Sequence, residues 1–292
     1  MKDMKYQYAR LNIAQKLIVV NVLVFIVNAI LPFLFGWNKD VLIQWFELPK
    51  DLGRFLTQPW SLVTYSFFHG GIWHLFWNMI ILYFSSRIFL NLFGGRKLTN
   101  VYFLGVILGG LIFMLSYNVF PVFAGARTAL IGASAGVTAV LIFICTYIPN
   151  QEVRLFFFNI KLWYLGVFVV LLDLIQIPSS GNAGGHLAHL GGAFLGYLYA
   201  RQLTKGNDIG AWFSNILDGI SDLFNSKRSA KAPMKTVYRK KKERGAKKDA
   251  VDYDKESKQR KIDSILDKIS KSGYESLSKE EKDYLFKAGK ED

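Results

Sequence analysis

The side chains best suited to chemistry in this chain are one serine and four histidines. Ser134 lies in the segment IGASAGVTAV, and a serine hydroxyl becomes a nucleophile when a base removes its proton. The histidines form two groups, His69 with His74 and His186 with His189. An imidazole nitrogen within about 2.6–3.2 Å of the hydroxyl can act as that base. A histidine of the second group is therefore a candidate base for Ser134, which predicts acyl-transfer chemistry.

A serine nucleophile also needs donors for the oxyanion that develops in the transition state. His74 and Asn78 are four residues apart and share one face of a helix. The backbone N–H groups around Ser134 add donors if a helix begins there. These groups together predict an oxyanion hole.

A metal site is the alternative, because imidazole is the commonest metal ligand. The histidines lie in HGGIWH and HLAH, without the glutamate of a zinc-protease H-E-x-x-H helix. Asp173 and Arg87 are the clear charges inside apolar segments, and neither belongs to the histidine clusters in sequence. The spacing disfavours a metal, so neither metal ligands nor a cofactor are predicted, but the alternative stays open.

The elements that must position these residues are apolar. A helix needs about 20 mainly apolar residues to cross a hydrocarbon core of ~30 Å. Six segments qualify: 16–37, 72–93, 100–120, 132–148, 162–177 and 186–203. The sequence therefore predicts an all-α, polytopic membrane protein.

Glycines could bring the serine and histidine together. Helix axes ordinarily lie 8–10 Å apart, too far for these two short side chains to meet. Small residues four apart allow closer approach, and such pairs occur as Gly132 with Gly136 and as Gly192 with Gly196. In the alternative reading, the glycines serve only helix packing and the serine hydrogen-bonds its own helix.

The charge is divided between two parts of the 292-residue chain. Residues 1–204 carry 14 basic and 6 acidic residues, whereas residues 205–292 carry 22 and 16. Basic residues gather in alternate loops of the first part, which predicts a bacterial inner (cytoplasmic) membrane with both termini cytoplasmic. The divided charge argues against a nucleic-acid partner. The single cysteine, Cys145, excludes an intrachain disulfide framework.

The tail divides into three predicted segments after the membrane domain of residues 1–204. Residues 205–226 form an amphipathic helix, which either lies on the membrane surface or packs on a protein partner. Residues 227–259 are a basic linker, either attracted to anionic lipid or solvated. Residues 260–292 form a helical hairpin, in which Ser278 and Glu281 have the spacing of a capping box.

These motifs resemble the rhomboid intramembrane serine proteases over about residues 60–196. The matching segments are HGGIWHLFWNM, GASAG and AHLGGAFLG. The resemblance implies a six-transmembrane-helix bundle with a cytoplasmic helical tail. It implies Ser134 as nucleophile and His189 as general base and then acid, a dyad with no acidic third member. It further implies an oxyanion hole of His74, Asn78 and the N–H groups of Ala133 and Ser134, with a structural role for His69.

Three positions depart from the pattern of many rhomboids. Ser61 follows Trp60 where an arginine is common, Leu90 replaces a glutamate, and Ala135 replaces the glycine after the serine. None of these positions carries a catalytic group. The expected function is cleavage of a transmembrane protein substrate within a lipid bilayer, with anionic lipid at the tail. The alternatives are a catalytically silent rhomboid-like binding protein and a histidine-based metal-dependent membrane protein.

Overall fold

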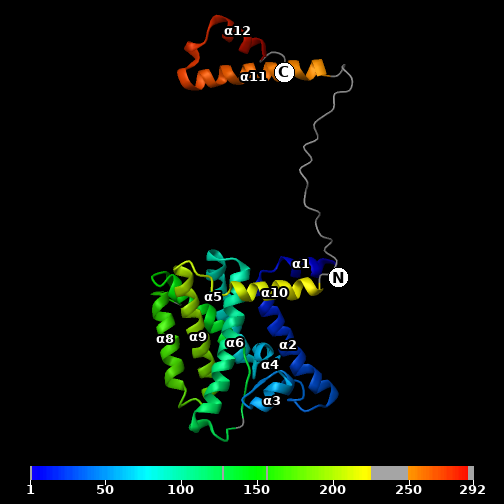
Figure 1. Ribbon diagram of the computed structural model, residues 1–292, viewed down its shortest axis with the longest axis vertical. Coiled ribbons are helices and arrows are strands. Elements are labelled where there is room, and N and C mark those ends of the chain that lie inside the picture. The colour runs from blue at the N-terminus through cyan, green and yellow to red at the C-terminus, as the bar shows by residue number, and fades with distance from the viewer. Residues whose placement is uncertain (1, 127, 156, 225–248, 289–292) are drawn as a thin grey trace. The chain divides into compact units, whose positions relative to one another are not determined.

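The computed structural model describes residues 2–126, 128–155, 157–224 and 249–288. The chain forms two compact units, Met1–Lys227 and Arg228–Asp292. Both units are predominantly helical (Figure 1).

A helix occupies every apolar segment that the sequence marks. They are α2 (Ile13–Phe35), α5 (Ile72–Leu92), α6 (Gly95–Val119), α7 (Ser134–Tyr147), α8 (Leu162–Gln176) and α9 (Ala183–Thr204). Among the described residues, α2, α5 and α6 are long and apolar enough to cross a membrane. The helices α7 and α8 are apolar but shorter, and α9 contains polar residues and glycines.

Local sequence sets several helix ends. Asn12 and Gln15 form a capping box at the start of α2, and Gly36, in a left-handed conformation, caps its C-terminal end after Phe35. Asn182 caps α9 by accepting a hydrogen bond from the backbone N–H of Gly185. The short α1 (Lys2–Arg10) precedes α2.

The core of the first unit is built around α7. This helix packs against α5, α6, α8 and α9, and its residues from Ala135 to Cys145 are all buried. In Figure 1, α8 and α9 lie side by side at one edge of the bundle, and α2 lies toward the opposite edge. The most buried helix therefore begins at Ser134.

The loop between α2 and α5 folds into short elements. They are η1 (Ile43–Trp45), β1 (Leu48–Pro49), α3 (Leu52–Thr57), α4 (Ser61–Thr64) and η2 (Tyr65–Phe67). The strand β1 pairs antiparallel with β2 (Ala129–Leu130), which follows η3 (Pro121–Phe123). This pairing connects the loop to the segment that leads into Ser134.

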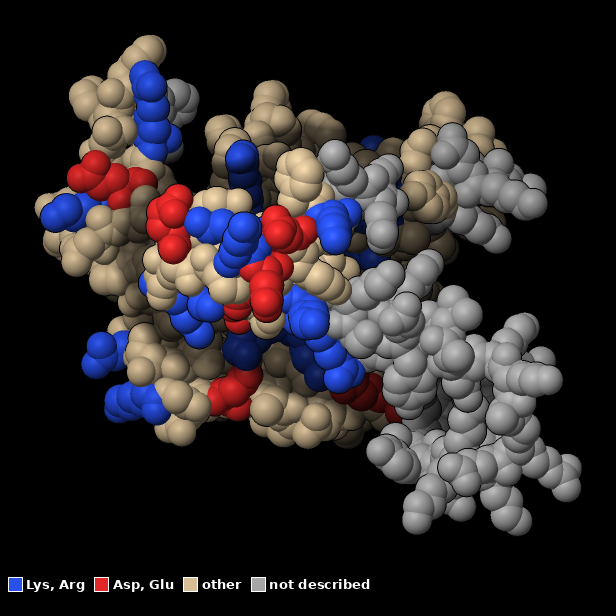
Figure 2. Space-filling view, turned by 90° about the horizontal axis from the view of Figure 1, so that it is seen from above, with Lys and Arg blue, Asp and Glu red and all other residues tan. Residues whose placement is uncertain are grey.

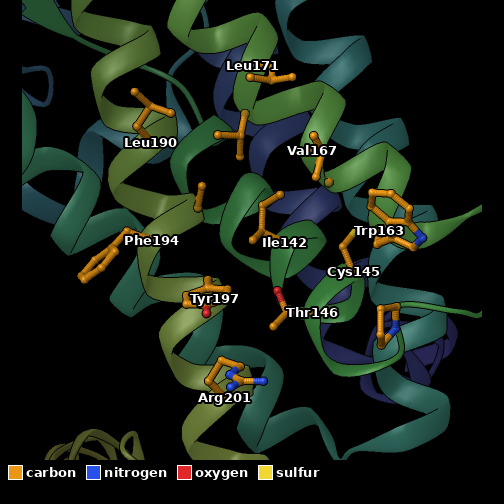
Figure 3. A pocket seen from close by; sticks show the side chains of 14 residues that line it. Ile142, Cys145, Thr146, Trp163, Val167, Leu171, Leu190, Phe194, Tyr197 and Arg201 are labelled. Carbon is orange, nitrogen blue, oxygen red and sulfur yellow. The ribbon is translucent and has the colours of Figure 1, made fainter.

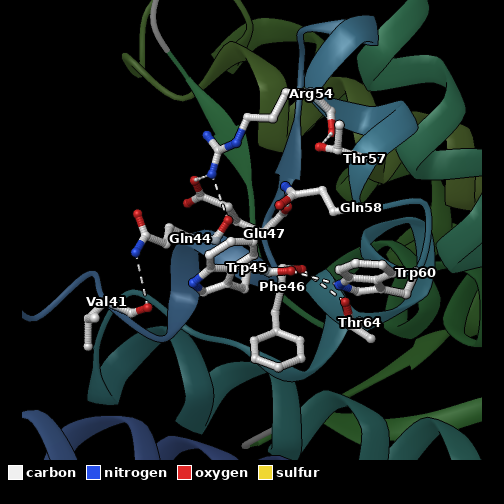
Figure 4. A network of polar contacts seen from close by, with 10 residues as sticks. All are labelled: Val41, Gln44, Trp45, Phe46, Glu47, Arg54, Thr57, Gln58, Trp60 and Thr64. Carbon is white, nitrogen blue, oxygen red and sulfur yellow. Dashed lines mark hydrogen bonds and ion pairs between the residues drawn. The ribbon is translucent and has the colours of Figure 1, made fainter.

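Polar contacts hold the loop together (Figure 4). The Arg54 guanidinium donates to the carbonyl of Gln44 at 2.6 Å and pairs with Glu47 at 3.2 Å. The Trp60 indole donates to the carbonyl of Trp45 at 2.8 Å. Ser61, which follows Trp60, carries no charge. The cationic side chain that makes these contacts within the loop is Arg54.

The described residues contain four short strands, which the predicted all-α pattern lacks. Between α7 and α8, β3 (Glu152–Leu155) and β4 (Phe158–Lys161) form an antiparallel hairpin. After α9, α10 (Ala211–Phe224) docks on α6, where Asn100 donates to the Gly210 carbonyl and to Ser214 Oγ. The opposite face of α10 exposes Trp212, Ile216 and Ile220.

The second unit contains α11 (Asp249–Ser272), η4 (Tyr274–Ser276) and α12 (Lys279–Ala288). The predicted capping box is confirmed, because Ser278 and Glu281 exchange side-chain to backbone hydrogen bonds of 2.8 and 3.2 Å. Lys268 of α11 pairs with Glu281 at 2.9 Å, and this contact holds the pKa of Glu281 below its usual value. Residues 227–248 of the predicted basic linker lie outside the described residues, and residues 249–259 belong to α11, so the helix begins before the predicted hairpin at residue 260.

The charged side chains are mixed in sign. Figure 2 shows Lys and Arg side chains interspersed with Asp and Glu side chains among the described residues.

Candidate active site

Ser134 is the first residue of α7, and the backbone before it is held in place. The N–H of Gly132 donates to the carbonyl of Tyr65 at 3.0 Å, and Gly132 has a φ of 122°. Ser134 is partly exposed, although the residues around it are buried. Because the first N–H groups of a helix have no intrahelical partner, the backbone at Ser134 offers donors beside its hydroxyl.

The contact between α7 and α9 is a close backbone approach. A Cβ at Gly192 would lie 2.1 Å from the carbonyl oxygen of Ala135, and one at Gly196 would lie 2.2 Å from that of Ala139. Both pairs have the same offset, 192 − 135 = 196 − 139 = 57, so the two helices run parallel. Extended by three residues, this register places His189 level with residue 132, at the end of α7 where Ser134 lies.

The first glycine pair differs from the expectation. Gly132 precedes α7 instead of packing within it, and a Cβ there would lie 2.8 Å from the His74 ring. Gly136 faces α6, where a Cβ would lie 2.9 Å from Tyr102. The residues of α7 that contact the glycines of α9 are Ala135 and Ala139. Alanine, like glycine, is small enough to permit close approach of two helices.

His74 lies near the Ser134 hydroxyl. The Cβ position of Gly132 is 2.8 Å from His74 Nε2 and 3.6 Å from Ser134 Oγ. Asn78, one turn later on α5, is buried and donates to the carbonyl of His74 at 2.9 Å. His74 therefore borders the space in front of Ser134, whereas one amide N–H of Asn78 is engaged within its own helix.

His69 supports the backbone before Ser134. Its buried Nε2 accepts a hydrogen bond from the N–H of Ala133 at 3.4 Å. Burial, and secondarily the neighbouring His74, lowers the pKa of His69 to about 3, so its ring is neutral and can accept. The N–H of Ala133, expected in the oxyanion hole, is thus directed to His69 in this structure.

Asp173 of α8 joins the other two histidines, contrary to the expectation that no carboxylate lies near them. Its Oδ1 is 2.8 Å from Nδ1 of His189 and 2.8 Å from Nδ1 of His186. Asp173 and His186 are buried, and His189 is partly exposed. The contact could not be predicted from sequence because 13 and 16 residues separate the partners, although a charged residue in an apolar helix was the available signal.

Asp173, His186 and His189 are also the one trio, among the described residues, whose ligand atoms could hold a metal ion. These atoms lie within 4.8 Å of one another. The histidine-based metal alternative therefore has a definite location in the fold.

No hydrogen bond joins Ser134 to His189, both of which the structure describes. Such contacts are often long in a substrate-free site and tighten only with substrate. The fold brings Ser134, His74 and His189 to one end of the α7–α9 contact. It places Asp173 behind His189 and His69 behind Ala133.

Two cavities lie near this site, and neither is lined by Ser134 or His189. The first, of about 720 Å³, lies between α2 and the loop and reaches His69, Gly70 and Gly71. The second, of about 590 Å³, is largely apolar and lies between α7, α8 and α9 (Figure 3). It extends from Leu171 and Leu190 to Arg201, the one charged residue in its lining.

Comparisons with known proteins give two family matches. A family model described as Rhomboid domain matches residues 56–206, about half of the chain. A second, described as a family of unknown function (DUF6576), matches residues 248–288. The second match coincides with α11 and α12 and carries no functional information.

Several curated proteins are similar to the first unit. RHOMBOID-like protein 12, mitochondrial, of Arabidopsis thaliana is 30% identical over 185 residues, covering 58% of this chain and 54% of that protein. Presenilin-associated rhomboid-like protein, mitochondrial, of Homo sapiens is 28% identical, covering 66% and 48%. Rhomboid-like protease 3 of Toxoplasma gondii is 28% identical, covering 57% and 60%. The chain spans about half the length of the curated relatives it matches.

The expected bacterial inner membrane, with both termini cytoplasmic, is contradicted by this comparison. The Arabidopsis and human relatives are named as mitochondrial proteins. Basic residues in loops reflect the side of a membrane on which a loop lies. They do not distinguish a bacterial membrane from an organellar one, which is why the sequence argument failed.

Proposed function

Because the chain belongs to the rhomboid family, we propose that it is an intramembrane serine endopeptidase that cleaves transmembrane segments of other membrane proteins. Ser134 is the nucleophile, and His189 is the general base and then the general acid. The observation that carries the proposal is the parallel α7–α9 contact, whose register brings both residues to the same end.

The mechanism follows from these positions. His189 takes the proton of the Ser134 hydroxyl as the oxygen attacks a peptide carbonyl of the substrate. The oxyanion then receives hydrogen bonds from the N–H of Ser134 at the start of α7, from His74 and, after its amide turns, from Asn78. Gly132 is required between these groups, because a side chain there would collide with the His74 ring.

The depth of Ser134 supports an intramembrane site. At 1.5 Å per residue, the 14 residues of α7 extend about 21 Å, less than the ~30 Å of a hydrocarbon core. We propose that all six helices α2 and α5–α9 lie in the membrane. Ser134 then lies below the membrane surface, with water reaching it from the side opposite the basic loops. A substrate must unwind at the cut site, because an intact helix hides its carbonyls.

The remaining surfaces fit a bilayer. The exposed apolar face of α10, formed by Trp212, Ile216 and Ile220, lies on the membrane surface. The tail binds anionic lipid. We propose that the membrane domain ends at residue 204 and the amphipathic segment at residue 226, and that residues 205–292 act in recruitment and not in catalysis.

The decisive experiment uses the full chain in lipid vesicles with a single-span test substrate. Ser134→Ala and His189→Ala should abolish cleavage, and Ser85→Ala, a buried helical serine that bonds only its own helix, is the matched control. Substitution of His74 or Asn78 by alanine should lower kcat by ~10²–10³-fold, the range for one oxyanion donor. Full activity of Ser134→Ala would refute the mechanism.

The rival functions have their own readout. A serine-directed fluorophosphonate should label the wild-type chain at Ser134, and a chelator should not prevent labelling. An unlabelled, inactive chain would indicate a catalytically silent binding protein. Chelator-sensitive activity would indicate the metal-dependent alternative at Asp173, His186 and His189.

A further inference from the structure

Asp173 is a buried carboxylate that the mechanism above does not use. The residues of α8 that are buried are Leu162, Gly166 and Asp173, which share one face at spacings of four and seven. That face packs on α7 and α9, so α8 directs its single charge into the protein. A buried charge is costly unless it is paired or hydrogen-bonded. The structure supplies two partners, both on α9.

The partners define which nitrogen carries each proton. An ionised carboxylate only accepts hydrogen bonds, so the Nδ1 atoms of His186 and His189, each 2.8 Å from Oδ1, both carry hydrogen. In a neutral imidazole with hydrogen on Nδ1, Nε2 keeps its lone pair. His189 is therefore held in the form whose Nε2 can accept a proton, and it is the partly exposed member of the pair.

The distances in this structure are those of hydrogen bonds. Two ligands about 2.0–2.1 Å from a tetrahedral zinc lie roughly 3.3 Å apart. The separations of 2.8 Å from one oxygen to both ring nitrogens are those of charge-assisted hydrogen bonds.

We propose that Asp173 is a positioning residue for His189, completing a Ser–His–Asp arrangement across α7, α9 and α8. The inference rests on the proposed protease function. As Ser134 Oγ bonds to the carbonyl carbon, its proton passes to His189 Nε2. When the carbon–nitrogen bond breaks, that proton passes to the leaving nitrogen. Asp173 remains ionised throughout and stabilises the imidazolium.

The test is Asp173→Asn in the full chain in lipid vesicles. We expect kcat to fall by ~10²-fold or more, because the amide no longer fixes the tautomer, with KM within about threefold of wild type. The acidic limb of the pH–rate profile should move to lower pH, because the imidazolium loses its counter-charge. The titratable groups facing this centre are Asp173 on α8, His186 and His189 on α9, and His74 on α5.

Asp208→Asn is the matched control. Asp208 accepts a hydrogen bond from Tyr199 at 2.5 Å and pairs with Lys97 at 3.2 Å, so the variant also loses a hydrogen-bonded carboxylate. It should lower thermal stability without moving the acidic limb. Asp173→Glu restores the charge, and its kcat should be at least tenfold above that of Asp173→Asn. This variant also keeps the test informative if the asparagine variant folds poorly.

Distinct outcomes separate the two proposals. Wild-type kcat and an unmoved limb in Asp173→Asn, with Ser134→Ala inactive, would overturn this inference alone. Activity in Ser134→Ala would overturn the proposed function itself. Loss of wild-type activity with a chelator, restored by zinc, would replace the hydrogen-bonded arrangement with a metal site.

Discussion

The helices α7 and α8 are both short and apolar, yet they occupy opposite environments. In α7, every residue from Ala135 to Cys145 is buried. In α8, only three of 15 residues are buried, and side chains such as Phe168 and Ile175 are exposed. The central helix begins at Ser134, the proposed nucleophile, and the peripheral helix directs the carboxylate of Asp173 to His189 on α9.

This difference teaches that hydropathy alone does not distinguish a central helix from a lipid-facing one. Small residues distinguish the two helices, because α7 contacts its neighbours through Ala135, Gly136 and Ala139. A lipid-facing helix has no such requirement, since lipid tails adapt to large side chains. The position of a helix should therefore determine how much a substitution in it lowers the free energy of unfolding.

The largest effect should come from Gly192→Val at the α7–α9 contact. Its Cβ would lie 2.1 Å from the Ala135 carbonyl oxygen, a rigid backbone atom. We expect a cost above ~3 kcal/mol, with loss of the folded bundle and of cleavage. Rapid alkylation of Cys145, the one cysteine of the chain and buried in α7, would report the opening.

Gly219→Val in α10 is the matched control, because a Cβ there meets nothing within 4 Å. It should keep wild-type protection of Cys145. Equal alkylation in the two variants would show that the α7–α9 contact is not the constraint described above.

An intermediate effect is expected at the α7–α8 contact. In Gly166→Ala, the new Cβ would lie 2.9 Å from the Cβ of Cys145. The contact is with a side chain, so α8 can shift outward at a cost of about 1–2 kcal/mol. Thermal unfolding in detergent should detect a lower midpoint, and Cys145 should become several-fold more reactive. A midpoint loss as large as that of Gly192→Val would erase the contrast between α7 and α8.

The smallest effect is expected on the outer face of α8. Leu174 is 48% exposed and directed away from the protein, so Leu174→Ala should change stability by less than ~0.5 kcal/mol. Cleavage should also stay within about twofold of wild type. A large loss of activity, with unchanged stability, would instead assign this face to substrate contact.

Much of the fold could be predicted because it is local. The helices lie within a few residues of the apolar segments, and the capping box at Ser278 follows from spacing alone. The glycines at 192 and 196 indicated a close approach, and the structure supplies their partners. The strands β1–β4 were not predicted, because runs of two to four residues have too little periodicity to detect.

The site was predicted less completely, because its contacts join residues that lie far apart in the sequence. Ser134, His74 and His189 could be singled out by residue type and motif. Asp173 could not be placed beside His189, because nothing in α8 itself specifies which neighbour its buried face meets. The pairing of Ala133 with His69 also depends on a loop folded 64 residues away.

The contact at Gly192 has a genetic consequence. Every amino acid other than glycine carries a Cβ, and there a Cβ would overlap the Ala135 carbonyl. Every missense change in that codon therefore meets the same collision, whatever the polarity or charge of the new residue. A population of this gene should tolerate only synonymous variants at this codon, and deep mutational scanning should record it as intolerant to all nineteen replacements.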